Sequence, residues 1–95
     1  MMEVTHNMLS SDEFIKRCKS LVMEYENTHL DPTDNVSISE DDVYVVWSCF
    51  ILGEQKALLS TILTDGMYFE LTYDKNKNSI YFDAYKKWDN KEIKL

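Results

Sequence analysis

The sequence predicts an α+β domain in which an N-terminal amphipathic helix packs on an antiparallel meander sheet of four to five strands. Apolar residues recur at helical spacing in residues 10–30, and after Asn35 they recur at every second position, the spacing of strands. The chain has 95 residues, enough for one hydrophobic core. We therefore expect a single domain at residues 10–95, preceded by a flexible arm at residues 1–9.

The segment SSDEFIKRCKSLVMEYENTHL is expected to form the helix. Ser10 and Glu13 fit a capping box, in which the hydroxyl and the carboxylate satisfy two free amide donors at the helix start. The helix should end before Pro32, because a proline disfavours helical angles in the residue that precedes it. The apolar residues of the expected buried face are Phe14, Cys18, Leu21 and Tyr25, with Ile15 and Val22 beside them.

The run VYVVWSCFIL at residues 43–52 carries no charge and is expected to be a strand that is apolar on both faces. Such a strand is typical of the centre of a sheet, covered on both faces, or of a strand that exposes one face to a partner. Its odd positions, Val43 to Ile51, are all apolar and should face the helix. Because one helix covers only one face, we expect Tyr44, Val46 and Phe50 to need cover from the N-terminal arm, the C-terminal tail or another chain.

The next strand is expected in KALLSTIL, residues 56–63, and further strands are expected at residues 67–73 and 79–85, separated by the turn DKNKN. A candidate edge strand at residues 36–38 precedes the long apolar run, and Gly53 favours a tight hairpin after it. A last short strand, with Ile93 and Leu95, is expected to follow Trp88.

Two registers keep the faces of residues 67–73 and 79–85 aligned. One sets Glu70 opposite Asp83, where the like charges cost energy. The other sets Glu70 opposite Tyr81 and centres the turn on residues 75 and 76. We predict the second register, which also places Tyr68 opposite Asp83.

In either register, the sheet face away from the helix is an aromatic surface with two carboxylates, and we expect it to bind a protein partner or a second copy of the chain. The alternatives are cross-strand pairs that stiffen a solvated sheet, or a ligand pocket. The predicted residues of this surface are Tyr44, Tyr68, Glu70, Tyr81, Asp83, Tyr85 and Trp88.

A second candidate partner-binding surface is an acidic region, since residues 20–55 contain no lysine or arginine. The net charge of −7 disfavours direct nucleic-acid binding, which needs basic residues for phosphate contacts. Spaced carboxylates can instead imitate phosphates. The residues of the acidic region are Glu24, Glu26, Asp31, Asp34, Glu40, Asp41 and Asp42.

Other classes of protein find little support. The apolar run is about half the length of a membrane span, and the N-terminus lacks the basic flank and apolar stretch of a signal peptide. Cys18 and Cys49 have no metal-ligand spacing and are expected to be buried free thiols. We expect a cytoplasmic protein with no catalytic residues, no metal and no cofactor.

Three segments carry a resemblance to a known family: DNVSISEDDVYVVWSCFILGEQKALLST, DGMYFELTYD and IYFDAYKKWDNKEIKL. The chain resembles small proteins of no assigned activity that are encoded by phages and prophages of low-GC Gram-positive bacteria. The resemblance implies a phage-derived protein in the bacterial cytoplasm. We therefore expect a non-enzymatic accessory protein that binds a host or phage protein. The alternatives are an acidic DNA mimic that inhibits a host nucleic-acid-binding or defence protein, and a homodimeric structural module.

Overall fold

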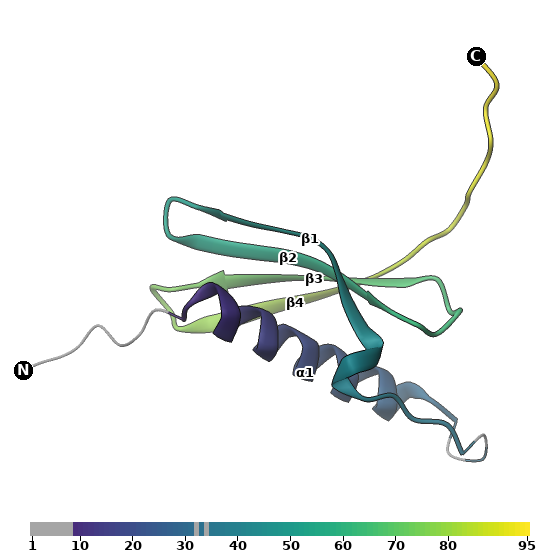
Figure 1. Ribbon diagram of the computed structural model, residues 1–95, viewed down its shortest axis with the longest axis horizontal. Coiled ribbons are helices and arrows are strands. Elements are labelled where there is room, and N and C mark those ends of the chain that lie inside the picture. Colours follow the sequence, from purple (N-terminus) through teal and green to yellow (C-terminus); the bar gives the residue numbers. More distant parts are fainter. Residues whose placement is uncertain (1–8, 32, 34) are drawn as a thin grey trace, which may run out of the picture.

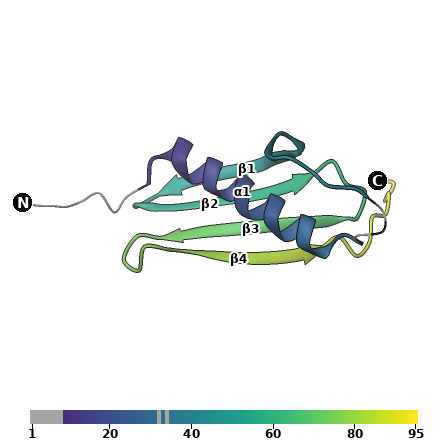
Figure 2. The ribbon, with the colours of Figure 1, turned by 90° about the horizontal axis from the view of Figure 1, so that it is seen from below.

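In the computed structural model, which describes residues 9–31, 33 and 35–95, one helix lies across one face of a four-stranded antiparallel sheet (Figures 1 and 2). The strands follow one another in the sheet in chain order, so the sheet is a meander with β1 and β4 at its edges. The predicted α+β class and the N-terminal helix are confirmed. The elements are α1 (Ser11–His29), the 3-10 turn η2 (Glu40–Asp42), β1 (Val43–Ile51), β2 (Glu54–Thr61), β3 (Met67–Asp74) and β4 (Ser79–Lys86).

The two ends of α1 follow the local sequence signals. The Glu13 amide donates to the Ser10 hydroxyl at 3.1 Å and the Ser10 amide donates to the Glu13 carboxylate at 3.0 Å, so the predicted capping box is confirmed. The helix ends at His29 with Leu30 as its C-cap. Leu9, expected in the flexible arm, is half-buried, and its carbonyl accepts a hydrogen bond of 2.7 Å from the Gln55 side chain. Residues 1–8 of that arm lie outside the described residues.

The core lies between α1 and the sheet. The buried helix residues recur at every fourth position, which keeps them on one side of the helix. Burial raises the pKa of the Cys18 thiol to about 12, because a thiolate would be poorly solvated among apolar side chains. The buried apolar residues are Phe14, Cys18, Val22, Ile38, Val43, Ala57, Leu59, Phe69, Leu71 and Tyr73.

A β-bulge interrupts β1 and changes which side chains face the helix. Val45 pairs with Leu59, but the next residue of β2, Leu58, pairs with Trp47, so one residue of β1 is left over. Beyond this point the faces are opposite to those predicted. The odd positions from Trp47 to Ile51 point away from α1, and Phe50 shares a hollow with Phe14 beside the helix.

The long apolar strand is an edge strand of the sheet, so of the two alternatives for it the central position is excluded. The predicted edge strand at residues 36–38 is absent. Asn27 of α1 binds this segment instead. Its side-chain oxygen accepts from the Ile38 backbone amide at 2.9 Å, and its side-chain nitrogen donates to the Ile38 carbonyl at 3.0 Å. These bonds satisfy the backbone that a neighbouring strand would otherwise pair. The predicted last strand is also absent, since residues 87–95 form no regular structure.

The register of β3 and β4 differs from the one predicted. Glu70 lies opposite Asp83, and Thr72 lies opposite Tyr81. The turn chemistry accounts for this register, because the Asp74 carboxylate accepts from the amides of Asn76 at 3.0 Å and Lys77 at 3.3 Å. These bonds fix a four-residue loop at residues 75–78, one residue further along the chain than the predicted turn centre.

Candidate functional site

The sheet face opposite α1, called here the outer face, is the largest exposed set of aromatic side chains on the sheet. Tyr44, Trp47, Tyr81 and Tyr85 each expose between 42% and 51% of their surface. In Figure 1 no helix or loop of the described chain lies over this face, while α1 covers the other. The strand residues on the outer face are Tyr44, Trp47, Cys49, Ile51, Glu54, Lys56, Leu58, Ser60, Tyr68, Glu70, Thr72, Asp74, Ser79, Tyr81, Asp83 and Tyr85.

One row of side chains crosses the outer face from edge to edge. Trp47 of β1 pairs with Leu58 of β2, and Leu58 pairs with Glu70 of β3. Asp83 of β4 completes the row beside Glu70. Within the described part of the chain, no lysine or arginine nitrogen lies within ion-pair distance of either carboxylate. The row is therefore apolar at one end and carries two unneutralised like charges at the other.

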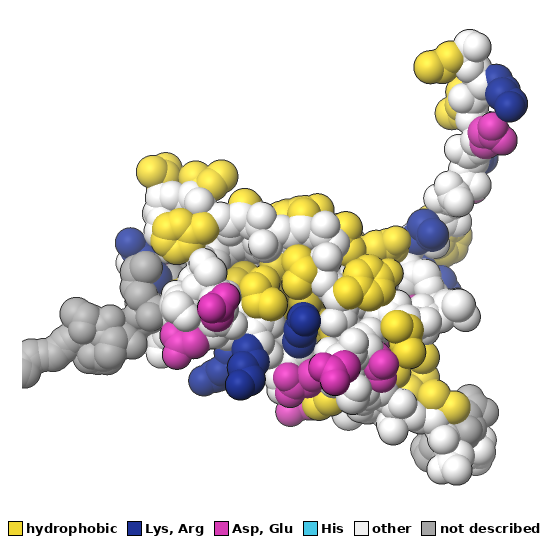
Figure 3. Space-filling view, in the orientation of Figure 1, with side chains coloured by type: hydrophobic (Ala, Val, Ile, Leu, Met, Phe, Trp, Pro, Cys, Tyr) yellow, Lys and Arg dark blue, Asp and Glu magenta, His cyan; other side chains and the backbone are white. Residues whose placement is uncertain are grey.

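The outer face continues onto the β1–β2 hairpin. Leu52 and Gly53 form its two-residue turn with φ angles of 52° and 82°, as in a type I′ turn. Leu52 is almost fully exposed, and it lines a hollow of about 320 Å³ with Cys49 and Ile51. Figure 3 shows hydrophobic side chains gathered at this hairpin and along the sheet. Cys49 is exposed here, so the prediction that both thiols are buried is wrong for this one.

Two predicted binding residues lie away from the surfaces to which they were assigned. Trp88 is 91% exposed in the tail, residues 87–95, which runs away from the sheet in Figure 1. It is therefore not part of the outer face. Glu26 of the predicted acidic region is only 4% exposed and belongs to the core.

Residues that the sequence reasoning missed complete the outer face: Trp47, Cys49, Ile51 and Leu58. The bulge at Val46 brings the first three to this face. The sequence does show that residues 43–52 are apolar on both faces. This pattern predicts that some of them are exposed but does not identify which ones.

The rest of the acidic region is broken up by local roles and by basic neighbours. The Asp31 carboxylate accepts from the Thr33 amide at 2.9 Å, and Asp42 accepts from the Ser39 amide at 2.9 Å. Glu40 shares a hollow with Lys16 and Arg17 of α1. Figure 3 shows lysine and arginine side chains beside the carboxylates on this side of the molecule. Glu24 and Asp41 are exposed, and Asp34 lies outside the described residues.

Glu26 forms a polar cluster with the buried Thr61 and with Asp65, which is half-buried in the β2–β3 loop. The Thr61 hydroxyl donates to Glu26 Oε2 at 3.4 Å. The pKa of Glu26 is raised to about 7, mainly by burial and then by the hydrogen bond and negative charge of Asp65, against the smaller opposite effect of Thr61. Glu26 and Thr61 are each only 4% exposed, whereas Asp65 is half-buried at the edge of the cluster, so the Glu26 carboxyl group itself is shielded from solvent.

The described residues contain neither a metal-binding cluster nor a membrane-spanning helix. No group of three or more histidine, cysteine, aspartate or glutamate side chains is arranged to hold a metal ion. Among the same residues, no helix is both long enough and apolar enough to cross a membrane.

The fold and the outer face together define a small α+β protein with one open sheet face. The model of a family of unknown function, DUF6275, matches residues 15–95, and the chain belongs to this family. The match contains the four strands and all but the first turn of the helix. Neither the curated proteins nor the solved structures give a significant match.

Proposed function

We propose that this protein is a non-enzymatic protein-binding module and that the outer face is its binding surface. The observation that carries the proposal is the set of half-exposed aromatic side chains on a sheet face that the described chain leaves uncovered. Tryptophan and tyrosine dominate binding energies at interfaces, because they bury a large area with little loss of rotamer freedom.

The charges of the outer face specify the chemistry of the partner. Glu70 and Asp83 lie side by side, and a lysine or arginine of the partner would relieve their repulsion. Trp47 and Leu58 at the other end of the row offer an apolar surface. We therefore expect a partner segment that presents an apolar side chain next to a basic one.

The absence of catalysis in this proposal rests on accessibility. Glu26, whose pKa is raised to about 7, is enclosed in the core, where a substrate would not reach it. The outer-face carboxylates lie on an open sheet face, where solvent screens their interactions.

The proposed setting is the cytoplasm of a bacterial cell, with the protein acting as a phage or prophage accessory protein. The resemblance of the sequence to such proteins supports this setting. The two free thiols fit a reducing compartment as well, since Cys18 is buried and Cys49 is exposed.

An acidic DNA mimic has less support. Glu26 is removed from the acidic region by burial, and the remaining carboxylates do not form a continuous surface because Lys16 and Arg17 lie beside Glu40. A mimic needs a regular array of carboxylates without interspersed cations.

The test compares partner binding by two variants, each of which replaces exposed apolar side chains. Tyr44→Ser combined with Trp47→Ser removes two aromatic residues of the outer face, and Ile62→Ser removes an exposed apolar residue from the β2–β3 loop. Proteins retained from a Gram-positive bacterial lysate by the immobilised wild type should be lost with the double variant and kept with Ile62→Ser. The affinity for an identified partner should fall about 30-fold. Equal retention by all three proteins, or no retention by any, would contradict the proposal.

A further inference from the structure

The two edges of the sheet differ in how they are protected. β1 carries the bulge at Val46, a device that discourages further pairing at an edge. β4 pairs with β3 without interruption from Ser79 to Lys86 and contains no proline or glycine. An uninterrupted edge strand presents a row of unpaired amide and carbonyl groups.

The described chain leaves the free side of β4 open. β4 is the last strand of the sheet and has β3 as its one neighbour among the described strands. After β4, the Lys87 amide donates to the Gly66 carbonyl at 2.7 Å. This bond continues the β3–β4 pairing by one residue pair, and the tail that follows runs away from the sheet in Figure 1.

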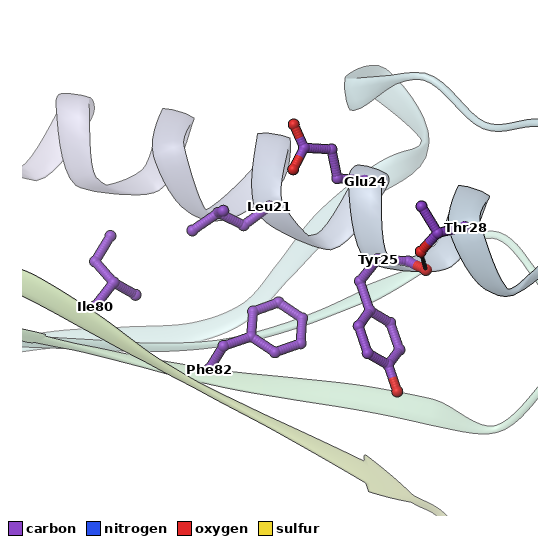
Figure 4. A pocket seen from close by; sticks show the side chains of 6 residues that line it. All are labelled: Leu21, Glu24, Tyr25, Thr28, Ile80 and Phe82. Carbon is purple, nitrogen blue, oxygen red and sulfur yellow. Dashed lines mark hydrogen bonds between the residues drawn. The ribbon is translucent and has the colours of Figure 1, made fainter.

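An apolar groove runs beside this edge on the helix side of the sheet (Figure 4). Its volume is about 400 Å³, and Leu21 and Tyr25 of α1 face Ile80 and Phe82 of β4 across it. The groove exists because α1 packs mainly over β1, β2 and β3. Tyr25 reaches Phe82, with 5.2 Å between ring centroids, but the helix does not cover the rest of the β4 inner face.

The sequence of β4 is complementary to itself in one antiparallel register. With Phe82 opposite the partner's Phe82, Tyr81 faces the partner's Asp83 and Ile80 faces the partner's Ala84. No like charges meet, and a large side chain lies opposite a small one. Two neighbouring registers also keep the faces aligned. One would set Asp83 opposite the partner's Asp83, which costs energy, and the other would be centred on Tyr81 and would pair only residues 79–83 instead of residues 79–85.

We propose that two copies of this chain form a homodimer by antiparallel pairing of β4 with the partner's β4 about Phe82. The two four-stranded sheets then become one sheet of eight strands with both helices on the same face. The grooves of the two copies meet at the junction. The outer faces join into one surface, so the dimer is compatible with the proposed function but does not depend on it.

The first test is the solution mass by sedimentation from micromolar to near-millimolar concentrations. The wild type should reach the mass of a dimer. Ala84→Lys places a charge at the junction at a position that is exposed in the single chain, and it should weaken the dimer by about tenfold or more. Val36→Lys, in an exposed loop, should leave the dimer unchanged. A monomer at every concentration, or a dimer that Ala84→Lys does not weaken, would overturn the proposal.

The second test is disulfide pairing in a Cys49→Ser background. A mixture of Tyr81→Cys and Asp83→Cys chains should crosslink, because the two positions are opposite each other within disulfide reach. Each variant alone should crosslink poorly, since its own copies are about 8 Å apart in this register. Crosslinking through Tyr44→Cys on the other edge, or by each β4 variant alone, would assign the contact elsewhere.

The two proposals fail separately. Tyr44→Ser with Trp47→Ser changes the β1 side of the outer face and should abolish partner binding while the dimer persists. Ala84→Lys should dissociate the dimer while the monomer keeps its outer face. Loss of the dimer with the first variant would contradict the β4 interface.

Discussion

The carboxyl group of Glu26 lies in the core, where Thr61 donates to it at 3.4 Å and Asp65 adds a second negative charge. Its pKa is raised from 4.5 to about 7, first by desolvation and then by Asp65. Between these two pH values the folded chain binds more protons than the unfolded chain. The free energy of unfolding therefore falls as the pH rises through this window and stays level above it.

Replacing Glu26 by glutamine should remove this pH dependence. At about 1.4 kcal/mol per pKa unit, a change from 4.5 to about 7 corresponds to about 3 kcal/mol, present at low pH and lost by about pH 8. Glu26→Gln should thus be more stable than the wild type at about pH 8 and lose less stability between about pH 5 and about pH 8. Denaturant unfolding at several pH values measures this. Glu24→Gln, at an exposed position of the same helix, is the control and should keep the wild-type slope.

At the scale of the element, the β1–β2 hairpin carries a backbone conformation that its first turn residue tolerates poorly. Leu52 has φ of 52°, in the left-handed region where a leucine is disfavoured and an asparagine is accepted. Leu52→Asn should raise the free energy of unfolding by about 0.5 to 1 kcal/mol by making the Asn-Gly pair preferred in this turn. Chemical denaturation measures the gain. Ile51→Asn, one residue earlier in the strand, should give a loss instead, and a loss with Leu52→Asn would contradict the turn geometry.

The register of β3 and β4 can be tested through its central pair. Because Glu70 lies opposite Asp83, Asp83→Lys should replace a repulsion by an attraction and stabilise the fold by about 0.5 kcal/mol. Glu70→Lys should do the same. The two substitutions together should return the stability to near the wild-type value, since they restore a like-charge pair. Additive effects in this double-mutant cycle would mean that the two residues are not neighbours.

Features that depend on residues close in the sequence could be predicted. Features that depend on a balance between several interactions, such as the strand register, could not. The capping box of Ser10 and Glu13 involves residues three apart, so it could be recognised directly. The bulge could not, because residues 43–52 are apolar at nearly every position and a one-residue offset leaves that pattern unchanged. The β3–β4 register was misjudged because the turn bonds of Asp74 outweigh the weak repulsion between two solvated carboxylates.

At the scale of the whole molecule, the sequence predicts part of the set of side chains that share the outer face, while their role in binding stays a prediction. Tyr68, Tyr81 and Tyr85 were assigned to the outer face from strand alternation alone, and they lie there. The prediction that Glu26 lies on the surface is wrong, because it follows from the charge of the residue and ignores the helical spacing. Glu26 lies four residues after the buried Val22, which indicates the buried side of the helix.

The tail should contribute little to the stability of the single chain. Within the described structure, the ion pairs of residues 89–95 join Asp89 to Lys91 and Glu92 to Lys94, so both lie inside the tail itself. A chain ending at Trp88 should keep its free energy of unfolding within about 0.5 kcal/mol of the full-length value. Denaturation of the two chains in parallel measures this. A larger loss would show that the tail packs against the fold.

The bulge in β1 also sets a limit on how far copies of this molecule can join. A sheet with one open edge closes after a single pairing, and the assembly stops at two chains. If both edges were open, pairing at β4 and pairing at β1 would alternate from one copy to the next, and the sheet would grow into a fibre without a natural end. The extra residue at Val46 would therefore keep the assembly from growing beyond the dimer.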